Sequence, residues 1–99
     1  MSLQTVKTTA EGYLANRDDW SKELAQELAA KLGMELTEEH WKVISAARAI
    51  EGESGSSPGL RKISKRSETP IKLIYQLFPG GPAKLVAKLA GIPKPNSCL

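Results

Sequence analysis

Apolar residues recur every three or four positions along most of the chain, the spacing that places them on one face of an α-helix. In the first such segment the recurring positions are Trp20, Leu24, Leu28 and Leu32. Asp18 or Asp19 can cap the start of this helix. Gly33 suits the left-handed conformation that follows a helix end. We therefore expect a first helix from about Trp20 to Leu32.

The second helix carries the strongest start signal in the chain. Thr37 is a good N-cap residue, and Glu38 and Glu39 follow it in the first turn, where the helix dipole favours acidic side chains. Leu36 and Trp41 have the spacing of a hydrophobic staple. The apolar face continues to Ile50 and fades by Gly52.

Three prolines mark the starts of three more helices, because proline is favoured at the first helical position. Ser57-Pro58 predicts a helix through about Arg66, and Thr69-Pro70 predicts one through Phe78. After Pro79-Gly80-Gly81, Pro82 opens a fifth helix, which Gly91 ends.

The two ends of the chain have different patterns. Threonine and valine near residues 5–9 favour extended structure, and 10–12 supply a turn, so we expect a small hairpin that returns at Tyr13-Leu14. Pro93 and Pro95 exclude a helix at the other end.

The fold class is therefore mainly α (α+β): a compact bundle of about five helices, with a small N-terminal β-hairpin and a flexible C-terminal arm. Residues 1–90 would form the domain and residues 91–99 the arm.

Composition narrows the possible functions. The 99 residues are 40% hydrophobic and 25% charged, which is typical of one soluble domain. No stretch reaches the ~18 apolar residues of a membrane span. One cysteine (Cys98) and one histidine (His40) exclude an internal disulfide and make a four-ligand metal site improbable. We expect no metal, no cofactor, no membrane partner and a cytoplasmic location.

The net charge of +3 conceals an asymmetry between the two halves. Residues 1–55 carry ten acidic and six basic side chains, whereas residues 56–99 carry one acidic and eight basic ones. The basic run comprises Arg61, Lys62, Lys65 and Arg66. It can be a solvated face, a docking surface for an acidic partner, or a binding surface for RNA. Few aromatic residues accompany it, so we do not expect direct nucleic-acid binding.

Cys98 is the candidate for chemistry. A thiol near the tip of a terminal arm is poorly placed for a core, and its thiolate can attack sulfur and hold it reversibly. An incidental exposed cysteine is the competing interpretation. His40 lies at the third position of the second helix, where a polar side chain commonly serves the cap. The chain lacks a recognisable nucleophile–base pair, so a self-contained enzyme is the weakest hypothesis.

The chain resembles the DsrC/TusE family through motifs that follow one another along nearly its whole length. The most specific is Leu77-Phe78-Pro79-Gly80-Gly81-Pro82-Ala83-Lys84, which runs on through Ala90-Gly91-Ile92-Pro93-Lys94-Pro95 to the penultimate Cys98. Supporting matches are Glu11-Gly12-Tyr13-Leu14, Asp19-Trp20, Leu36-Thr37-x-Glu39-His40-Trp41 and Ser57-Pro58-x-Leu60-Arg61.

The resemblance implies a helical domain whose Cys98 carries sulfur, as a persulfide, from a donor protein to an acceptor protein. It implies a sulfurtransferase-type carrier similar to TusE, in the tRNA 2-thiouridine pathway or related sulfur trafficking. We expect Arg61, Lys84, Lys88 and Lys94 to form the basic docking surface. Family members that work with sulfite reductase have a second cysteine where this chain has Ala87. A single-cysteine paralogue that binds or regulates sulfite reductase, or another sulfur-metabolism system, is therefore the alternative.

Overall fold

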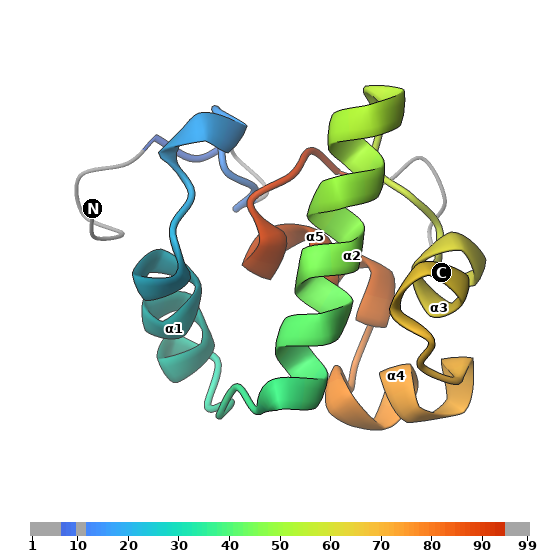
Figure 1. Cartoon of the computed structure of the whole chain (residues 1–99). Helices are drawn as coiled ribbons and strands as arrows, with labels where there is room; N and C mark the ends of the chain where they lie inside the picture. The colour runs from blue at the N-terminus through green and yellow to red at the C-terminus, as the bar shows by residue number, and fades with distance from the viewer. Residues whose placement is uncertain (1–6, 10–11, 95–99) are drawn as a thin grey trace.

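A computed structural model of the chain describes residues 7–9 and 12–94 and is built around one long helix, α2 (Glu38–Ser54). α3 (Leu60–Ser67) and α5 (Pro82–Ala90) pack most extensively against α2 (Figure 1). α1 (Lys22–Lys31) packs on α5, and α4 (Ile71–Leu77) lies against α2, α3 and α5. The radius of gyration is 12.1 Å, close to the roughly 13 Å of a compact 100-residue domain. The prediction of a compact bundle of about five helices is confirmed.

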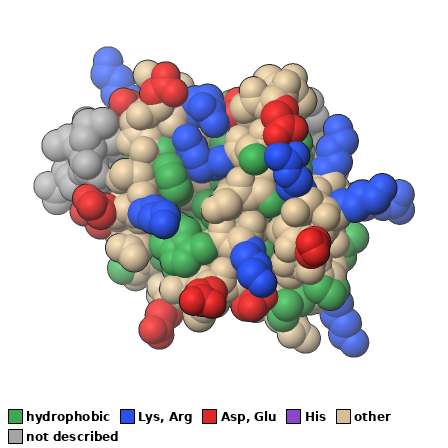
Figure 2. All heavy atoms as spheres, viewed as in Figure 1, with side chains coloured by type: hydrophobic (Ala, Val, Ile, Leu, Met, Phe, Trp, Pro, Cys, Tyr) green, Lys and Arg blue, Asp and Glu red, His purple; other side chains and the backbone are tan. Residues whose placement is uncertain are grey.

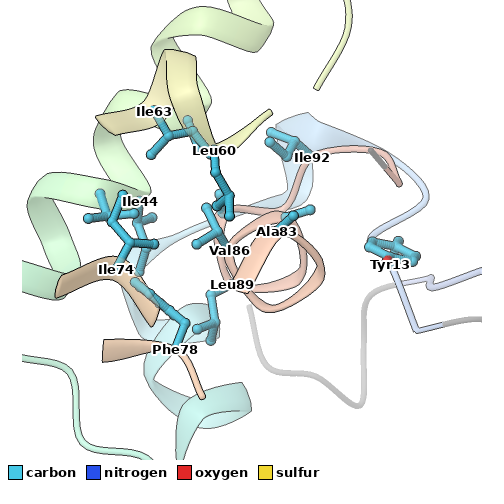
Figure 3. Close-up of a cluster of buried hydrophobic side chains, with 14 of the residues drawn as sticks. Tyr13, Ile44, Leu60, Ile63, Ile74, Phe78, Ala83, Val86, Leu89 and Ile92 are labelled. Atoms are coloured by element: carbon cyan, nitrogen blue, oxygen red, sulfur yellow. The ribbon is translucent and has the colours of Figure 1, made fainter. Parts of the chain in front are cut away.

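The core lies where α5 meets α2, α3 and α4 (Figure 3). Its largest fully buried side chains are Phe78, Ile44, Ile63, Ile74, Leu89, Ile92, Val43 and Val86. Each such side chain stabilises the fold by about 1.5–3 kcal/mol relative to an exposed one. Ile92 lies beyond the end of α5 yet points into this cluster, so the helical core extends past the last helix.

The expected start of the first helix is wrong by two residues. The side chain of Asn16 accepts a hydrogen bond from the backbone N–H of Asp18, and this cap starts a short 3₁₀ helix, η1 (Arg17–Asp19). Trp20 follows in an extended conformation, with φ −72° and ψ 146°. α1 then begins at Lys22, because Ser21 accepts the N–H of Leu24 at 3.1 Å.

The starts predicted from Pro58 and Pro70 also require correction. α3 begins at Leu60 with Gly59 as its N-cap, and α4 begins at Ile71 with Pro70 as its N-cap. Pro70 has a ψ of 143°, which is extended rather than helical. The fifth start is as predicted, with Pro82 in the first turn of α5.

The predicted N-terminal β-hairpin is wrong. The part of the chain that the structure describes contains no strand, and the pairing there is reduced to one antiparallel bridge between Thr8 and Leu14. Next to it, the N–H of Ala15 donates to the carbonyl of Lys7 at 2.9 Å. Two short strands with no third partner are marginal in water. The segment instead packs by burying Tyr13 and Leu14.

Residues 95–99 of the predicted arm lie outside the described part of the chain, and Cys98 is among them. The structure does describe the residues from which the arm departs, 91–94. No described helix has the length and apolar character needed to cross a membrane.

Candidate functional site

The residue that ends α5 is in tight contact with Trp20. Gly91 has a φ of +67°, in the left-handed region that a helix end commonly needs and that glycine adopts without steric cost. A Cβ placed on Gly91 would lie 2.6 Å from Cδ1 of Trp20. Glycine is therefore required at this position both by its backbone conformation and by the neighbouring indole.

The last carbonyl groups of α5 accept hydrogen bonds from two distant side chains. Nε1 of Trp20 donates to the carbonyl of Leu89 at 2.7 Å, and Nη1 of Arg48 donates to the carbonyl of Ala90 at 2.7 Å. The final carbonyls of a helix have no partner within the helix and must find one elsewhere. Trp20 and Arg48 satisfy this requirement and thereby fix the direction in which the chain leaves α5.

The next two residues are also held by the domain. The N–H of Ile92 donates to the carbonyl of Ala87 at 3.1 Å, and the Ile92 side chain is 1% exposed. The hydroxyl of Ser57, in the loop between α2 and α3, donates to the carbonyl of Pro93. We name residues 91–93 the arm root. Because it is anchored in the core, the tail beyond it starts from a fixed point.

Arg48 is the central cation of the arm root. Its guanidinium lies 4.2 Å from the centre of the Trp20 ring, within the range of a cation–π contact. Burial and the positive charge of Arg17 lower the pKa of Arg48. The negative charges of Glu51 and Asp18 act in the opposite direction and raise it. Arg17 forms an ion pair with the buried Glu51. An arginine stays protonated in this setting, so the group holds a fixed positive charge beside the arm root.

The predicted docking lysines Lys84 and Lys88 occupy one outward side of α5, four residues apart. Lys84 is exposed and Lys88 is half-buried, with its Nζ 5.4 Å from the centre of the Tyr13 ring. A cavity of about 20 Å³, the size of one water molecule, lies beside Lys88, Trp20 and Gly91. Lys88 therefore belongs to the surroundings of the arm root.

The other two predicted docking residues lie nearer α3. Arg61 is exposed on the first turn of α3, and Lys94 is exposed directly after the arm root. The Ser57–Pro93 hydrogen bond brings Lys94 to the loop that leads into α3. Arg61 thus lies on a different helix from Lys84 and Lys88. The structure thus gives two basic areas, one on α5 and one on α3, with the arm root contacting the elements that carry them.

His40 has the structural role that its position in the second helix predicts. Its Nδ1 accepts the N–H of Thr37 at 3.1 Å, completing a capping box. Its Nε2 lies 2.9 Å from the carbonyl of Leu77, to which it donates in the matching tautomer. The ring meets Phe78 edge to face at 5.0 Å. Both ring nitrogens are engaged, so His40 joins α2 to the end of α4. Elsewhere in residues 7–9 and 12–94, no three His, Cys, Asp or Glu side chains gather as a metal site requires.

Sequence reasoning did not identify the residues that form the anchor of the arm root. It placed Trp20 on the apolar face of the first helix and Ser57 at the start of the third, and it gave no role to Arg48. Trp20 and Leu89 are 69 residues apart, and Arg48 and Ala90 are 42 apart, so no local pattern links them. The available signal was a single arginine between two alanines in the middle of the second predicted helix.

Comparisons with known proteins find similar sequences and similar structures. A family model described as DsrC like protein matches residues 1–99. The sulfurtransferase TusE of Yersinia pseudotuberculosis serotype I is 42% identical over 101 residues, covering 95% of this chain and 94% of the relative. The NMR structure of Allochromatium vinosum DsrC is similar with a TM-score of 0.81 and 37% identity, covering 95% of this chain and 90% of that one. The oxidised gamma-subunit of the dissimilatory sulfite reductase (DsrC) from Archaeoglobus fulgidus has a TM-score of 0.79 and 35% identity, covering 95% and 92%.

Proposed function

Because the chain belongs to the family of DsrC-like proteins, we infer that it is a sulfur-relay carrier that receives sulfur from one protein and passes it to another. The observation that carries this inference is the 42% identity to a sulfurtransferase TusE along 95% of the chain. We further propose that Cys98 is the residue that holds the sulfur, because it is the only cysteine of the chain and therefore its only thiol.

The proposed transfer needs one thiol and no external oxidant or reductant. The Cys98 thiolate attacks the outer sulfur of a donor persulfide, a new S–S bond forms on Cys98, and the donor cysteine leaves as a thiolate. In the second step an acceptor thiolate attacks the outer sulfur of Cys98, and the Cys98 thiolate leaves. Each step forms one S–S bond and breaks another, so the electrons balance.

The anchored arm root supports this role for the tail. We propose that residues 1–90 act as the domain and residues 91–99 as the arm that carries Cys98. Cys98 lies five positions after Pro93 in the sequence, so it can reach at most about 17 Å from the Ser57–Pro93 anchor. A donor or acceptor must therefore dock close to the arm root.

The proposed docking surface consists of Arg61, Lys84, Lys88 and Lys94. Lys88 lies beside Gly91, Lys94 directly follows the arm root, Arg61 lies on α3 after the loop that holds Ser57, and Lys84 lies one turn before Lys88 on α5. Positive charge around a thiol also favours its thiolate, the form that attacks sulfur. The partners proposed are sulfur-donor and sulfur-acceptor proteins of the cytoplasm, where free thiols stay reduced.

We place the chain in the tRNA 2-thiouridine pathway or in related sulfur trafficking, as a TusE-like member. The alternative is a binding or regulatory subunit of sulfite reductase, because the A. fulgidus relative is the gamma-subunit of such an enzyme. With Ala87 where a second cysteine would stand, this chain cannot close an internal disulfide. That absence favours relay over a paired-cysteine redox cycle.

Intact-mass analysis after incubation with a persulfide donor tests the role of Cys98. The wild-type chain should gain about 32 Da, the mass of one sulfur atom, and the gain should disappear on reduction. Cys98→Ser should gain nothing while keeping its helical circular dichroism spectrum. An equal gain in Cys98→Ser, or no gain with any persulfide donor, would reject Cys98 as the carrier.

A further inference from the structure

A groove runs along the junction of α2 and α3, on a face that the relay chemistry does not use. Two open hollows of about 420 Å³ and 390 Å³ adjoin there and share Arg66 as a common wall. Figure 2 shows lysine and arginine side chains gathered over α3 and along its junction with α2. The groove therefore combines a recess with a basic border.

The floor of the groove is made of small and apolar residues of α2. Ala46, Ala49 and Ile50 line it, at spacings that place them on one side of that helix. Ala46 is 6% exposed and Ala49 is half-buried. The small side chains of Ala46 and Ala49 leave room for side chains that approach from outside, and Ala49 keeps apolar surface that a partner can cover.

The rim of the groove carries four cations and two carboxylates. Lys42, Lys62, Lys65 and Arg66 outnumber Glu53 and Glu68. Arg66 donates to both carboxylate oxygens of Glu53, at 3.0 and 2.5 Å, and so links α3 to α2. Among residues 7–9 and 12–94, the three lysines of the rim form no ion pair. Their charge is therefore available to a partner.

We propose that this groove binds an acidic, amphipathic helix of a partner protein. Such a helix would place its apolar residues against Ala46, Ala49 and Ile50, and its carboxylates beside the rim lysines, as helix-in-groove recognition requires. An RNA strand fits less well, because the floor offers no aromatic side chain for base stacking. The basic run of α3 is thus assigned to an acidic protein segment rather than to solvent.

The location of the groove connects it with the arm, and this connection rests on the proposed relay function. Glu53 and Lys62 flank one end of the groove, and the loop between their helices holds Ser57. Ser57 donates to the carbonyl of Pro93 in the arm root. A helix bound in the groove would therefore bring the rest of its protein within reach of an arm about 17 Å long.

NMR titration of the ¹⁵N-labelled full chain tests the groove. The probe is a synthetic helical peptide of about 18 residues with leucine and alanine on one face and glutamate elsewhere. A matched peptide with lysine in place of glutamate, and a single-stranded RNA, are titrated separately. The test variant is Lys62→Glu/Lys65→Glu, and its control is Lys31→Glu/Lys72→Glu, which makes the same change in net charge at exposed lysines of α1 and α4. Ala49→Leu fills the floor without changing charge, and circular dichroism verifies that each variant folds.

We expect different results from the three probes and from the variants. The acidic peptide should shift resonances of α2 and α3 residues along the groove, and the lysine peptide should not. Affinity should fall about tenfold or more in Lys62→Glu/Lys65→Glu, several-fold in Ala49→Leu, and less than about twofold in the control. Equal losses in the test and control variants, binding of RNA but not of the acidic peptide, or no peptide binding would each overturn the proposal.

Sulfur loading separates this proposal from the proposed function. Each variant is incubated with sodium polysulfide, and the mass of the chain is measured. Peptide binding without any gain of sulfur on Cys98 would overturn the relay function and leave the groove intact. A gain of sulfur without peptide binding would overturn the groove alone.

Discussion

Replacing Gly91 with alanine perturbs the arm root in two separable ways. The backbone there has a φ of +67°, and a residue with a Cβ loses about 1–2 kcal/mol in that left-handed conformation. The added Cβ would also lie 2.6 Å from Cδ1 of Trp20 and 2.9 Å from two further atoms of that side chain. Trp20 must then move, and its hydrogen bond to the carbonyl of Leu89 is lost, which costs about 1–3 kcal/mol. We expect a total loss of about 2–5 kcal/mol in the free energy of unfolding.

Gly33→Ala is the matched control for this substitution. Gly33 has a similar φ of +74°, but a Cβ there meets nothing within 4 Å. It should therefore lose the conformational part alone, about 1–2 kcal/mol. Urea denaturation followed by circular dichroism gives both values. If Gly91→Ala destabilises the chain no more than Gly33→Ala, the contact between Trp20 and the arm root does not constrain position 91, and the reasoning is wrong.

Three further substitutions probe the arm root and the α2–α3 junction, each followed by urea denaturation. Arg48→Ala should cost about 1–3 kcal/mol, because a carbonyl at the end of α5 loses its donor and Trp20 loses its cation; an unchanged midpoint would contradict this. Ile92→Ala should cost about 2–5 kcal/mol, the usual range for truncating a fully buried isoleucine, whereas a loss below about 0.5 kcal/mol would show that the residue lies outside the core. In Glu53→Gln the effect should depend on pH. The hydrogen bond and charge of Arg66 lower the pKa of Glu53 from its ordinary 4.5, so the pair stabilises the fold above that pH, and the difference from wild type should shrink as the pH falls below it. A difference that grows on acidification would refute the sign.

The helical architecture could be predicted because its signals are local. Thr37 with its following acidic residues, Pro82 and Gly91 each occur within one turn of the helix end that they define. The predicted starts of α1, α3 and α4 were wrong by one or two residues, because the residue just before each helix, Ser21, Gly59 or Pro70, has an extended backbone. The hairpin prediction was wrong because threonine and valine favour an extended backbone but do not by themselves provide a neighbouring strand.

Some residues of the candidate site could likewise be predicted from the sequence, and others could not. Cys98 and the four basic residues could be named from the sequence because composition, proline spacing and family motifs mark them. The anchor of the arm root could not, because Trp20, Arg48 and Ser57 reach it from three different parts of the chain. Contacts between residues 36 to 69 positions apart depend on how α2, α5 and the η1 segment pack, and no periodicity reports that packing.

The transfer of sulfur through Cys98 tests the central claim most directly. The chain is first loaded with sulfur from a persulfide donor, freed of donor, and then mixed with an acceptor thiol protein, while intact mass follows both proteins. The relay account requires the gain of about 32 Da to leave the wild-type chain and appear on the acceptor, with no transfer from Cys98→Ser. Sulfur that stays on the carrier, or that reaches the acceptor equally well from Cys98→Ser, would contradict it.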